Sequence, residues 1–179
     1  MNSQRKLKIC FIGGNQAGII GILTLLAKEC KILSAVSYSK NLTNILNSFK
    51  IRLYKSVNEK KFIKDLKQSD LLFSVHGKEI VKPSLLKLPR YGGINLHPYL
   101  YKYKGKSPVE RALKDKNFKA SVGAHIMTNK VDQGEVLVET FLDVSEAKSV
   151  QEIYNQLYPY YCLITLKVLK LLMRKKDEK

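Results

Sequence analysis

Short apolar runs alternate along this chain with longer segments whose apolar residues recur every three or four positions. The first run predicts a buried strand over residues 7–12, and the spacing after it predicts a helix over residues 15–28. The same signals predict strands at residues 32–37, 52–57 and 70–75 and helices at residues 42–48 and 58–67. Strands that alternate with helices predict an α/β fold with a doubly wound, mostly parallel sheet and helices on both faces.

The second half of the chain predicts more elements of the same kinds. Pro83 and Pro108 each mark the start of a short helix, because the fixed φ of proline suits the first helical turn. Ser149 and Glu152 form a capping box for a final helix to about residue 173, which Pro159 is expected to kink. Expected strands occupy residues 93–96, 121–128 and 135–144, the last two as partners. Because no internal repeat or linker is evident, we expect one domain over residues 1–179.

The composition is strongly basic, with a formal net charge of +17 at pH 7. Such a balance occurs in proteins that bind nucleic acid, acidic membranes or anionic small molecules. The lysines are spread along the whole chain rather than gathered on one helix, which favours a general lysine bias over a nucleic-acid surface. We therefore expect a small, phosphorylated substrate and neither a nucleic acid nor a membrane as partner.

Cysteine usage and hydropathy indicate the cellular compartment. The three cysteines are odd in number and lie mostly in apolar surroundings, which favours buried thiols over a disulfide framework. No stretch reaches about 18 uncharged apolar residues, and the polar N-terminus lacks the apolar region of a signal peptide. A cytoplasmic location is expected.

The candidate chemistry lies in Asn95-Leu96-His97-Pro98 and, after a basic loop, in Val131-Asp132-Gln133-Gly134. An Asn side chain can donate to a developing oxyanion, a His can donate or shuttle a proton, and an Asp can orient the imidazole. Asn95, His97 and Asp132 are therefore candidates for moving a carbonyl group between nitrogens. Both Asn95 and His97 fall near the carboxyl end of an expected strand, as His76 does, where ligands collect in open α/β sheets.

Other interpretations of these residues stay open. Asp132 followed closely by glycine is also typical of a hairpin turn. The three histidines, His76, His97 and His125, suggest a metal site, but none of them pair at ligand spacing and no cysteine lies nearby. No metal is expected.

Two further segments are candidates for binding. Gly13-Gly14-Asn15, at the start of the first expected helix, is suited to a phosphate. It is not a complete G-x-G-x-x-G motif and the acidic ribose-binding residue is missing, which disfavours a dinucleotide dehydrogenase. The alternating Tyr99, Tyr101 and Tyr103 could stack a nucleobase or sugar, or belong to a mobile loop over the site.

Four linked motifs resemble those of the formyltetrahydrofolate-dependent formyltransferases. They are Gly-Ile-Asn-Leu-His-Pro at residues 93–98, Tyr-Lys-Gly-Lys-Ser-Pro at 103–108, and the segments 121–125 and 131–136. The family includes glycinamide ribonucleotide formyltransferase, methionyl-tRNA formyltransferase and the sugar N-formyltransferases. The resemblance implies a Rossmann-like fold and transfer of a formyl group from the co-substrate 10-formyltetrahydrofolate to a primary amine, without a metal.

The resemblance also implies roles for particular residues. Asn95 and protonated His97 would stabilise the oxyanion, Asp132 would hold His97 charged, and His125 would either support Asp132 or only pack. The pterin would lie against the main chain of two segments, with the residues Lys78, Glu79, Ile80, Val81, Thr128, Asn129, Lys130 and Val131. The amine substrate would contact Gly13, Gly14, Asn15 and His76.

The resemblance leaves the acceptor amine open. A histidine at the place of His76 is similar to sugar N-formyltransferases, and the glycine-rich loop only partly matches the phosphate loop of glycinamide ribonucleotide enzymes. These features narrowly favour a nucleotide-linked amino sugar, whereas the short chain favours glycinamide ribonucleotide. Methionyl-tRNA is not expected, because only a final helix and a charged tail follow residue 144. A non-catalytic folate- or nucleotide-binding domain is a further alternative, and the apolar residues of the final helix could serve either the core or a homodimer.

Overall fold

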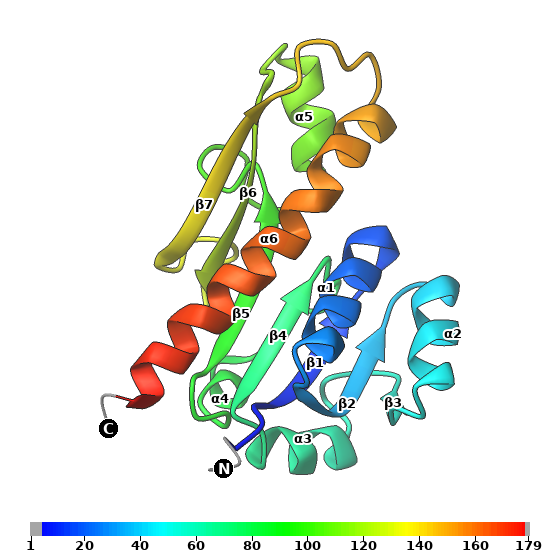
Figure 1. Ribbon diagram of the computed structural model, residues 1–179, viewed down its shortest axis with the longest axis vertical. Coiled ribbons are helices and arrows are strands. Elements are labelled where there is room, and N and C mark those ends of the chain that lie inside the picture. The colour runs from blue at the N-terminus through cyan, green and yellow to red at the C-terminus, as the bar shows by residue number, and fades with distance from the viewer. Residues whose placement is uncertain (1–4, 178–179) are drawn as a thin grey trace. The chain divides into compact units, whose positions relative to one another are not determined.

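A computed structural model describes residues 5–177 of the chain, with side chains described through residue 174 (Figure 1). Within this range the strands form a seven-stranded sheet of order β3-β2-β1-β4-β5-β6-β7. The pairs β1/β2, β1/β4 and β2/β3 are parallel, and the pair β6/β7 is antiparallel. These observations confirm the predicted α/β class with a doubly wound, mostly parallel sheet.

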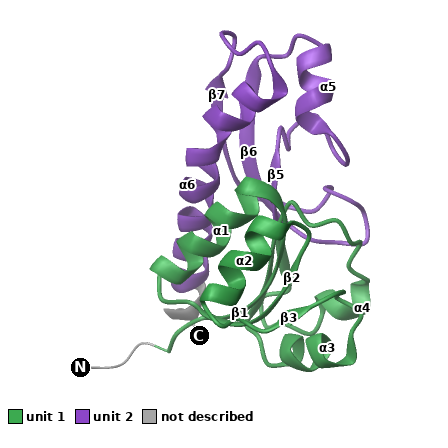
Figure 2. Ribbon diagram, turned by 90° about the vertical axis from the view of Figure 1, so that its right-hand side faces the viewer, with its two compact units in different colours: residues 1–94 green, residues 95–179 purple. Residues whose placement is uncertain are grey.

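The chain divides into two compact units, with the boundary between Ile94 and Asn95 (Figure 2). The expectation of one domain over residues 1–179 stays a prediction, and residues 1–4 and 178–179 lie outside the described range.

The described residues of the first unit, 5–94, form four parallel strands and four helices. They are β1 (Lys8–Gly13), α1 (Asn15–Ala27), β2 (Lys31–Ser37), α2 (Lys40–Ser48), β3 (Leu53–Tyr54), α3 (Lys60–Lys67), β4 (Leu71–Val75) and α4 (Pro83–Leu86). Strand β1 has a neighbour on each side, β2 and β4, and its residues from Ile9 to Gly13 are all buried, as expected for a central parallel strand. Full burial of an apolar side chain contributes about 1.5–3 kcal/mol, and this unit fully buries Phe11, Phe62 and Phe73 among others.

Strand β3 is shorter than the sequence predicted. The apolar pattern predicted a strand over residues 52–57, whereas only Leu53 and Tyr54 are in strand conformation. The carboxylate of Glu59 accepts the backbone N–H groups of Lys55 and Ser56, which turns the chain toward α3. A local side-chain acceptor thus replaces the strand pairing that the apolar pattern suggested.

The second unit contains the rest of the sheet and two helices. Its elements are β5 (Gly93–Pro98), which begins two residues before the boundary, α5 (Pro108–Lys114), β6 (Lys119–Ile126), β7 (Val136–Asp143) and α6 (Val150–Asp177). Helix α6 packs against β6, β7 and α5 (Figure 1). It continues through Pro159 as one helix.

The predicted capping box of α6 is confirmed. The N–H of Glu152 donates to Oγ of Ser149 at 3.2 Å, and the Glu152 carboxylate accepts from the Ser149 hydroxyl at 3.0 Å. The apolar residues of α6 that could serve the core or a homodimer differ in exposure: Leu169 is buried, Leu166 is half-buried, and Leu163 and Met173 are exposed.

The three cysteines are free. Burial raises the pKa of Cys10 and that of Cys30 to about 11, so both stay protonated thiols at neutral pH. In the described part of the chain, none of the helices has the length and apolar character required to span a membrane.

Candidate active site

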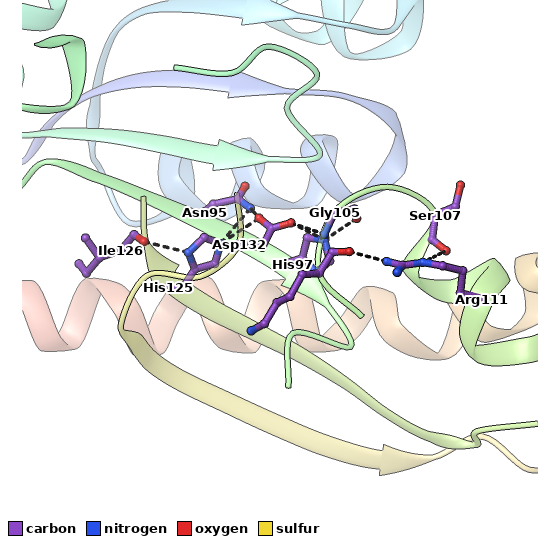
Figure 3. Close-up of polar contacts among 9 residues, drawn as sticks. Asn95, His97, Gly105, Ser107, Arg111, His125, Ile126 and Asp132 are labelled. Atoms are coloured by element: carbon purple, nitrogen blue, oxygen red, sulfur yellow. Dashed lines mark hydrogen bonds and ion pairs between the residues drawn. The ribbon is translucent and has the colours of Figure 1, made fainter. Parts of the chain in front are cut away.

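The candidate catalytic residues come from three places in the second unit. Asn95 and His97 lie on β5, His125 lies near the end of β6, and Asp132 lies in the turn between β6 and β7. Asn95 and His97 are two residues apart on one strand, so both side chains project from the same face of the sheet. Figure 3 shows that these four side chains converge.

The carboxylate of Asp132 is the centre of this group. Its Oδ2 lies 3.1 Å from Nε2 of His97 and accepts the backbone N–H of Gly105 at 2.8 Å. Its Oδ1 lies 3.2 Å from Nε2 of His125 and accepts from the Asn95 side-chain amide at 3.3 Å. One carboxylate therefore contacts all three other side chains and one backbone amide (Figure 3).

These contacts keep Asp132 ionised. Burial acts to raise the pKa of Asp132, but the hydrogen bonds from His125 and His97, the charge of His97 and the Gly105 N–H outweigh it. The pKa of this carboxyl is therefore well below the usual range of an aspartate. A fixed negative charge in a buried site stabilises a positive charge on a neighbouring imidazole.

The hydrogen-bond partners determine which ring nitrogen of His97 carries a proton. Nε2 of His97 faces two acceptors, the Asp132 carboxylate and the Gly105 carbonyl at 3.1 Å, so this nitrogen is the donor. Nδ1 of His97 is buried and has no hydrogen-bond partner among the described residues. A buried polar atom of this kind is suited to contact a polar group of a ligand.

His125 is oriented by a different acceptor. Its Nδ1 lies 2.9 Å from the carbonyl oxygen of Ile126, and a carbonyl only accepts, so Nδ1 carries the proton. Its Nε2 lies 3.2 Å from Oδ1 of Asp132, to which it donates when the ring carries both protons, and 3.3 Å from the Asn95 amide. Of the two interpretations of His125, contact with Asp132 is therefore the one that the geometry favours over packing alone.

The turn that holds Asp132 requires a particular glycine. Asp132 has a φ of 53°, in the left-handed region that Asp tolerates better than most residues. A Cβ on Gly134 would lie 1.8 Å from the carbonyl oxygen of Ile126, so only glycine fits beside the end of β6. Asp132 is thus a turn residue and also the residue that contacts Asn95, His97 and His125. The turn interpretation and the candidate catalytic interpretation of Asp132 are therefore compatible.

The tyrosine-rich loop places two of its three rings in the core, and its predicted mobility stays a prediction. Tyr99 and Tyr103 are buried, with ring centroids 5.7 Å apart in an edge-to-face arrangement, and their hydroxyls donate to Asn117 and Asp115. Neither ring is exposed for stacking a nucleobase or sugar. Tyr101 is partly exposed, and its ring packs edge-to-face near Phe141.

The residues predicted to contact the pterin lie in two loops. In the second unit Thr128, Asn129, Lys130 and Val131 are exposed and follow β6. The Thr128 hydroxyl donates to the Lys130 carbonyl at 3.1 Å and accepts the Lys130 N–H at 3.2 Å, which gives this loop a defined turn.

In the first unit Lys78, Glu79, Ile80 and Val81 follow β4, with Ile80 exposed and Val81 buried. The Glu79 carboxylate accepts from the Tyr38 hydroxyl at 3.0 Å, the Ser56 hydroxyl at 2.6 Å and the Val57 N–H at 3.2 Å. Sequence reasoning missed this side-chain role, because the three donors lie more than twenty residues away along the chain. No local pattern indicates such a contact.

The glycine-rich segment also lies in the first unit. The N–H of Gly14 donates to the Val75 carbonyl at 3.1 Å, and that of Asn15 donates to the Ser39 hydroxyl at 3.1 Å. A Cβ on Gly14 would lie 3.2 Å from the His76 carbonyl, so Gly14 and His76 are close, as the substrate-binding prediction requires. Two N–H groups expected for a phosphate are nevertheless already used, and the phosphate-binding role of Gly13, Gly14 and Asn15 stays a prediction.

Comparisons with known proteins agree with this architecture. Residues 5–160 match the formyl transferase family. The bifunctional polymyxin resistance protein ArnA of Wigglesworthia glossinidia brevipalpis is 25% identical over 185 aligned residues, which cover 95% of this chain and 28% of that protein. The methionyl-tRNA formyltransferase of Syntrophomonas wolfei is 27% identical over 157 residues, covering 78% of this chain and 50% of that protein. The chain thus spans half or less of these two relatives.

Solved structures show the same fold. The phosphoribosylglycinamide formyltransferase of Anaplasma phagocytophilum superposes with a TM-score of 0.82 at 17% identity, covering 96% of this chain and 89% of that one. The sugar 3N-formyl transferase WlaRD superposes with a TM-score of 0.75 at 16% identity, covering 96% of this chain and 65% of that one. The match over residues 5–160 confirms the resemblance seen in the motifs: the chain belongs to the formyl transferase family.

Proposed function

We propose that this protein transfers a formyl group from 10-formyltetrahydrofolate to the primary amine of a small substrate. The observation that carries the proposal is the contact of Asp132 with both Asn95 and His97, which leaves Nδ1 of His97 buried and without a partner among the described residues. Membership in the formyl transferase family supports the same activity.

Asn95, His97 and Asp132 together supply the two functions that formyl transfer requires, proton transfer and stabilisation of the oxyanion. His97 takes a proton from the attacking amine at Nδ1, because its Nε2 already donates toward Asp132. The ionised Asp132 stabilises the resulting imidazolium, which then donates from Nδ1 to developing negative charge on the carbonyl oxygen. The Asn95 amide is a further donor to that oxygen, through the hydrogen that lies toward Nε2 of His125 in the free protein.

The folate supplies the formyl group, and its nitrogen leaves with the proton that His97 returns. The residues proposed to hold the pterin are the exposed Thr128, Asn129, Lys130 and Val131, which directly precede Asp132. The Thr128–Lys130 turn presents backbone groups of this loop in a defined conformation, which fits main-chain recognition of a heterocycle. The roles of Lys78, Glu79, Ile80 and Val81 toward the pterin are part of the same proposal.

As acceptor we favour a nucleotide-linked amino sugar. The engaged N–H groups of Gly14 and Asn15 reduce the support for a phosphate held at this helix start, as a purine precursor would need. WlaRD, a sugar 3N-formyl transferase solved with dTDP and 5-N-formyl-THF, shares the fold. Glycinamide ribonucleotide is the second candidate, since phosphoribosylglycinamide formyltransferases share the fold over nearly the whole chain.

The proposal is tested by measuring tetrahydrofolate release from 10-formyltetrahydrofolate with purified protein and three acceptors. These are a panel of nucleotide-linked amino sugars, glycinamide ribonucleotide and methionyl-tRNA, the last because relatives carry that name. Release that depends on an amino sugar supports the full proposal. Release with another acceptor retains formyl transfer and replaces the substrate. Folate binding without release on any acceptor contradicts catalysis and supports a folate-binding domain.

A further inference from the structure

One residue of the loop before α5 contacts both partners of the histidine–aspartate pair. The N–H of Gly105 donates to Oδ2 of Asp132 at 2.8 Å, and its carbonyl oxygen lies 3.1 Å from Nε2 of His97 (Figure 3). The position of this one peptide segment therefore affects both the charge state of Asp132 and the orientation of the His97 ring.

Neither packing at the Cβ position nor regular secondary structure restrains the backbone at Gly105. A Cβ on Gly105 would meet no heavy atom within 4 Å, so nothing packs against the backbone from that side. Gly105 has a φ of 78°, and Ser107, two residues later, has a φ of 49°, so the backbone here lies outside strand and right-handed helical geometry. Hydrogen bonds therefore restrain this loop, those of Gly105 to Asp132 and His97 and those of the neighbouring carbonyls.

Arg111, in the middle of α5, restrains the neighbouring carbonyls. Its guanidinium donates to the carbonyl oxygen of Lys104 at 2.5 Å and, through Nε, to that of Ser107 at 3.4 Å. These carbonyls lie on either side of Gly105 in the chain. The guanidinium carbon also lies 5.5 Å from the ring centroid of the buried Tyr103, which donates from its hydroxyl to Asp115 at 2.9 Å.

We infer that Arg111 is a positioning residue. It holds the loop of residues 104–107 so that the N–H and carbonyl of Gly105 keep their contacts with Asp132 and His97. The planar guanidinium holds two carbonyls in a fixed geometry, whereas the ammonium of a lysine has rotatable donors on a flexible stem. The structural part of this inference is independent of the activity, whereas its catalytic consequence rests on the proposed formyl transfer.

The test compares Arg111→Ala and Arg111→Lys with the unaltered protein, and uses Lys114→Ala as the matched control. Lys114 is an exposed basic residue near the end of the same helix, so its removal changes the net charge equally. Two quantities are measured: the amide hydrogen-exchange rate of Gly105 by NMR in the free protein, and kcat and KM with the acceptor that supports release. Far-ultraviolet circular dichroism checks that each variant is folded.

We expect Gly105 exchange in Arg111→Ala to be about tenfold faster, as for the loss of one net hydrogen bond. We expect kcat to fall by about tenfold, because a small displacement of a catalytic group costs up to about 10²-fold. Arg111→Lys should give an exchange rate and a kcat between those of Arg111→Ala and the unaltered protein. Lys114→Ala should match the unaltered protein in both measurements.

Two results would overturn the inference. The first is unchanged Gly105 exchange in Arg111→Ala. The second is a change in KM alone: Arg111→Ala raises KM at constant kcat, Lys114→Ala raises it equally, and Arg111→Lys leaves it at the value of the unaltered protein. That pattern indicates only attraction of an anionic substrate. Faster Gly105 exchange in a protein that shows no formyl transfer with any acceptor supports the restraint and contradicts the proposed function, so the two failures are distinguishable.

Discussion

Nε2 of His97 lies 3.1 Å from Oδ2 of Asp132, and both side chains are about nine-tenths buried. Electrostatic interactions of a carboxylate in such a position are screened much less by water and salt than those on the surface. The pairing also assigns the two ring nitrogens, since Nε2 faces Asp132 and Nδ1 is left for another group. This assignment is what makes His97 a candidate acid and base rather than a buried structural histidine.

Loss of either member of this pair should reduce turnover. We expect His97→Ala and Asp132→Asn each to lower kcat for formyl transfer by about 10²-fold or more, the scale of a lost acid–base group or oxyanion donor. Gln133→Ala is the control, because Gln133 is exposed and adjacent to Asp132. Turnover that is unchanged in either variant removes that residue from the proposed mechanism.

The proton on His125 is a prediction that does not depend on activity. Nδ1 of His125 lies 2.9 Å from the Ile126 carbonyl, so we expect this nitrogen to stay protonated in both the neutral and the charged ring. The ¹⁵N chemical shifts of the imidazole, measured against pH in the free protein, report the tautomer. A neutral ring protonated at Nε2 would contradict the observed orientation.

The lowered pKa of Asp132 predicts a pH dependence of stability. Between an unfolded-state pKa of about 4 and its lower folded-state value, the unfolded chain binds more protons, so stability falls as the pH falls. The contribution of Asp132 is fully present above about pH 5. Denaturant unfolding at pH 6 and pH 3 should therefore show a larger loss of stability for the unaltered protein than for Asp132→Asn. Equal losses in the two proteins would show that Asp132 is not held ionised by its partners.

Gly134→Ala should destabilise the turn that carries Asp132. The new Cβ would lie 1.8 Å from the Ile126 carbonyl oxygen, so the backbone must move. Overpacking of this kind costs about 1–3 kcal/mol, measured as the free energy of unfolding in urea. The exposed Gln133→Ala is again the control, and full stability together with full activity of Gly134→Ala would mean that the turn adapts freely.

Glu79→Ala should destabilise the first unit. The substitution removes the acceptor for Tyr38, Ser56 and Val57, and part-buried donors left without a partner cost about 1–3 kcal/mol. The expected signs are a lower free energy of unfolding and faster proteolysis between residues 77 and 82. Glu135→Ala, at an exposed position, is the control. A Glu79→Ala protein as stable as this control would indicate that the three contacts contribute nothing measurable.

Most of the fold was predictable because the signals for its elements are local. The apolar spacing gave the positions of α1, α3 and β4 to within about two residues, and Ser149 with Glu152 marked the start of α6. Strand β3 was predicted too long. The carboxylate of Glu59 accepts two backbone N–H groups that a longer strand would have paired, and an apolar pattern does not indicate such a contact.

Local patterns along the chain predicted the order of strands and helices, the family to which the chain belongs, and the candidate catalytic residues Asn95, His97 and Asp132. Hydrophobic periodicity and motif spacing are properties of neighbouring residues, and they are present before the chain folds. The folded structure was needed to show that Nε2 of His97 faces Asp132, that the Gly105 N–H donates to Asp132, and that Tyr99 and Tyr103 lie in the core. These features depend on distances and directions between atoms of residues far apart in the chain. Such distances are fixed only when the folded protein packs.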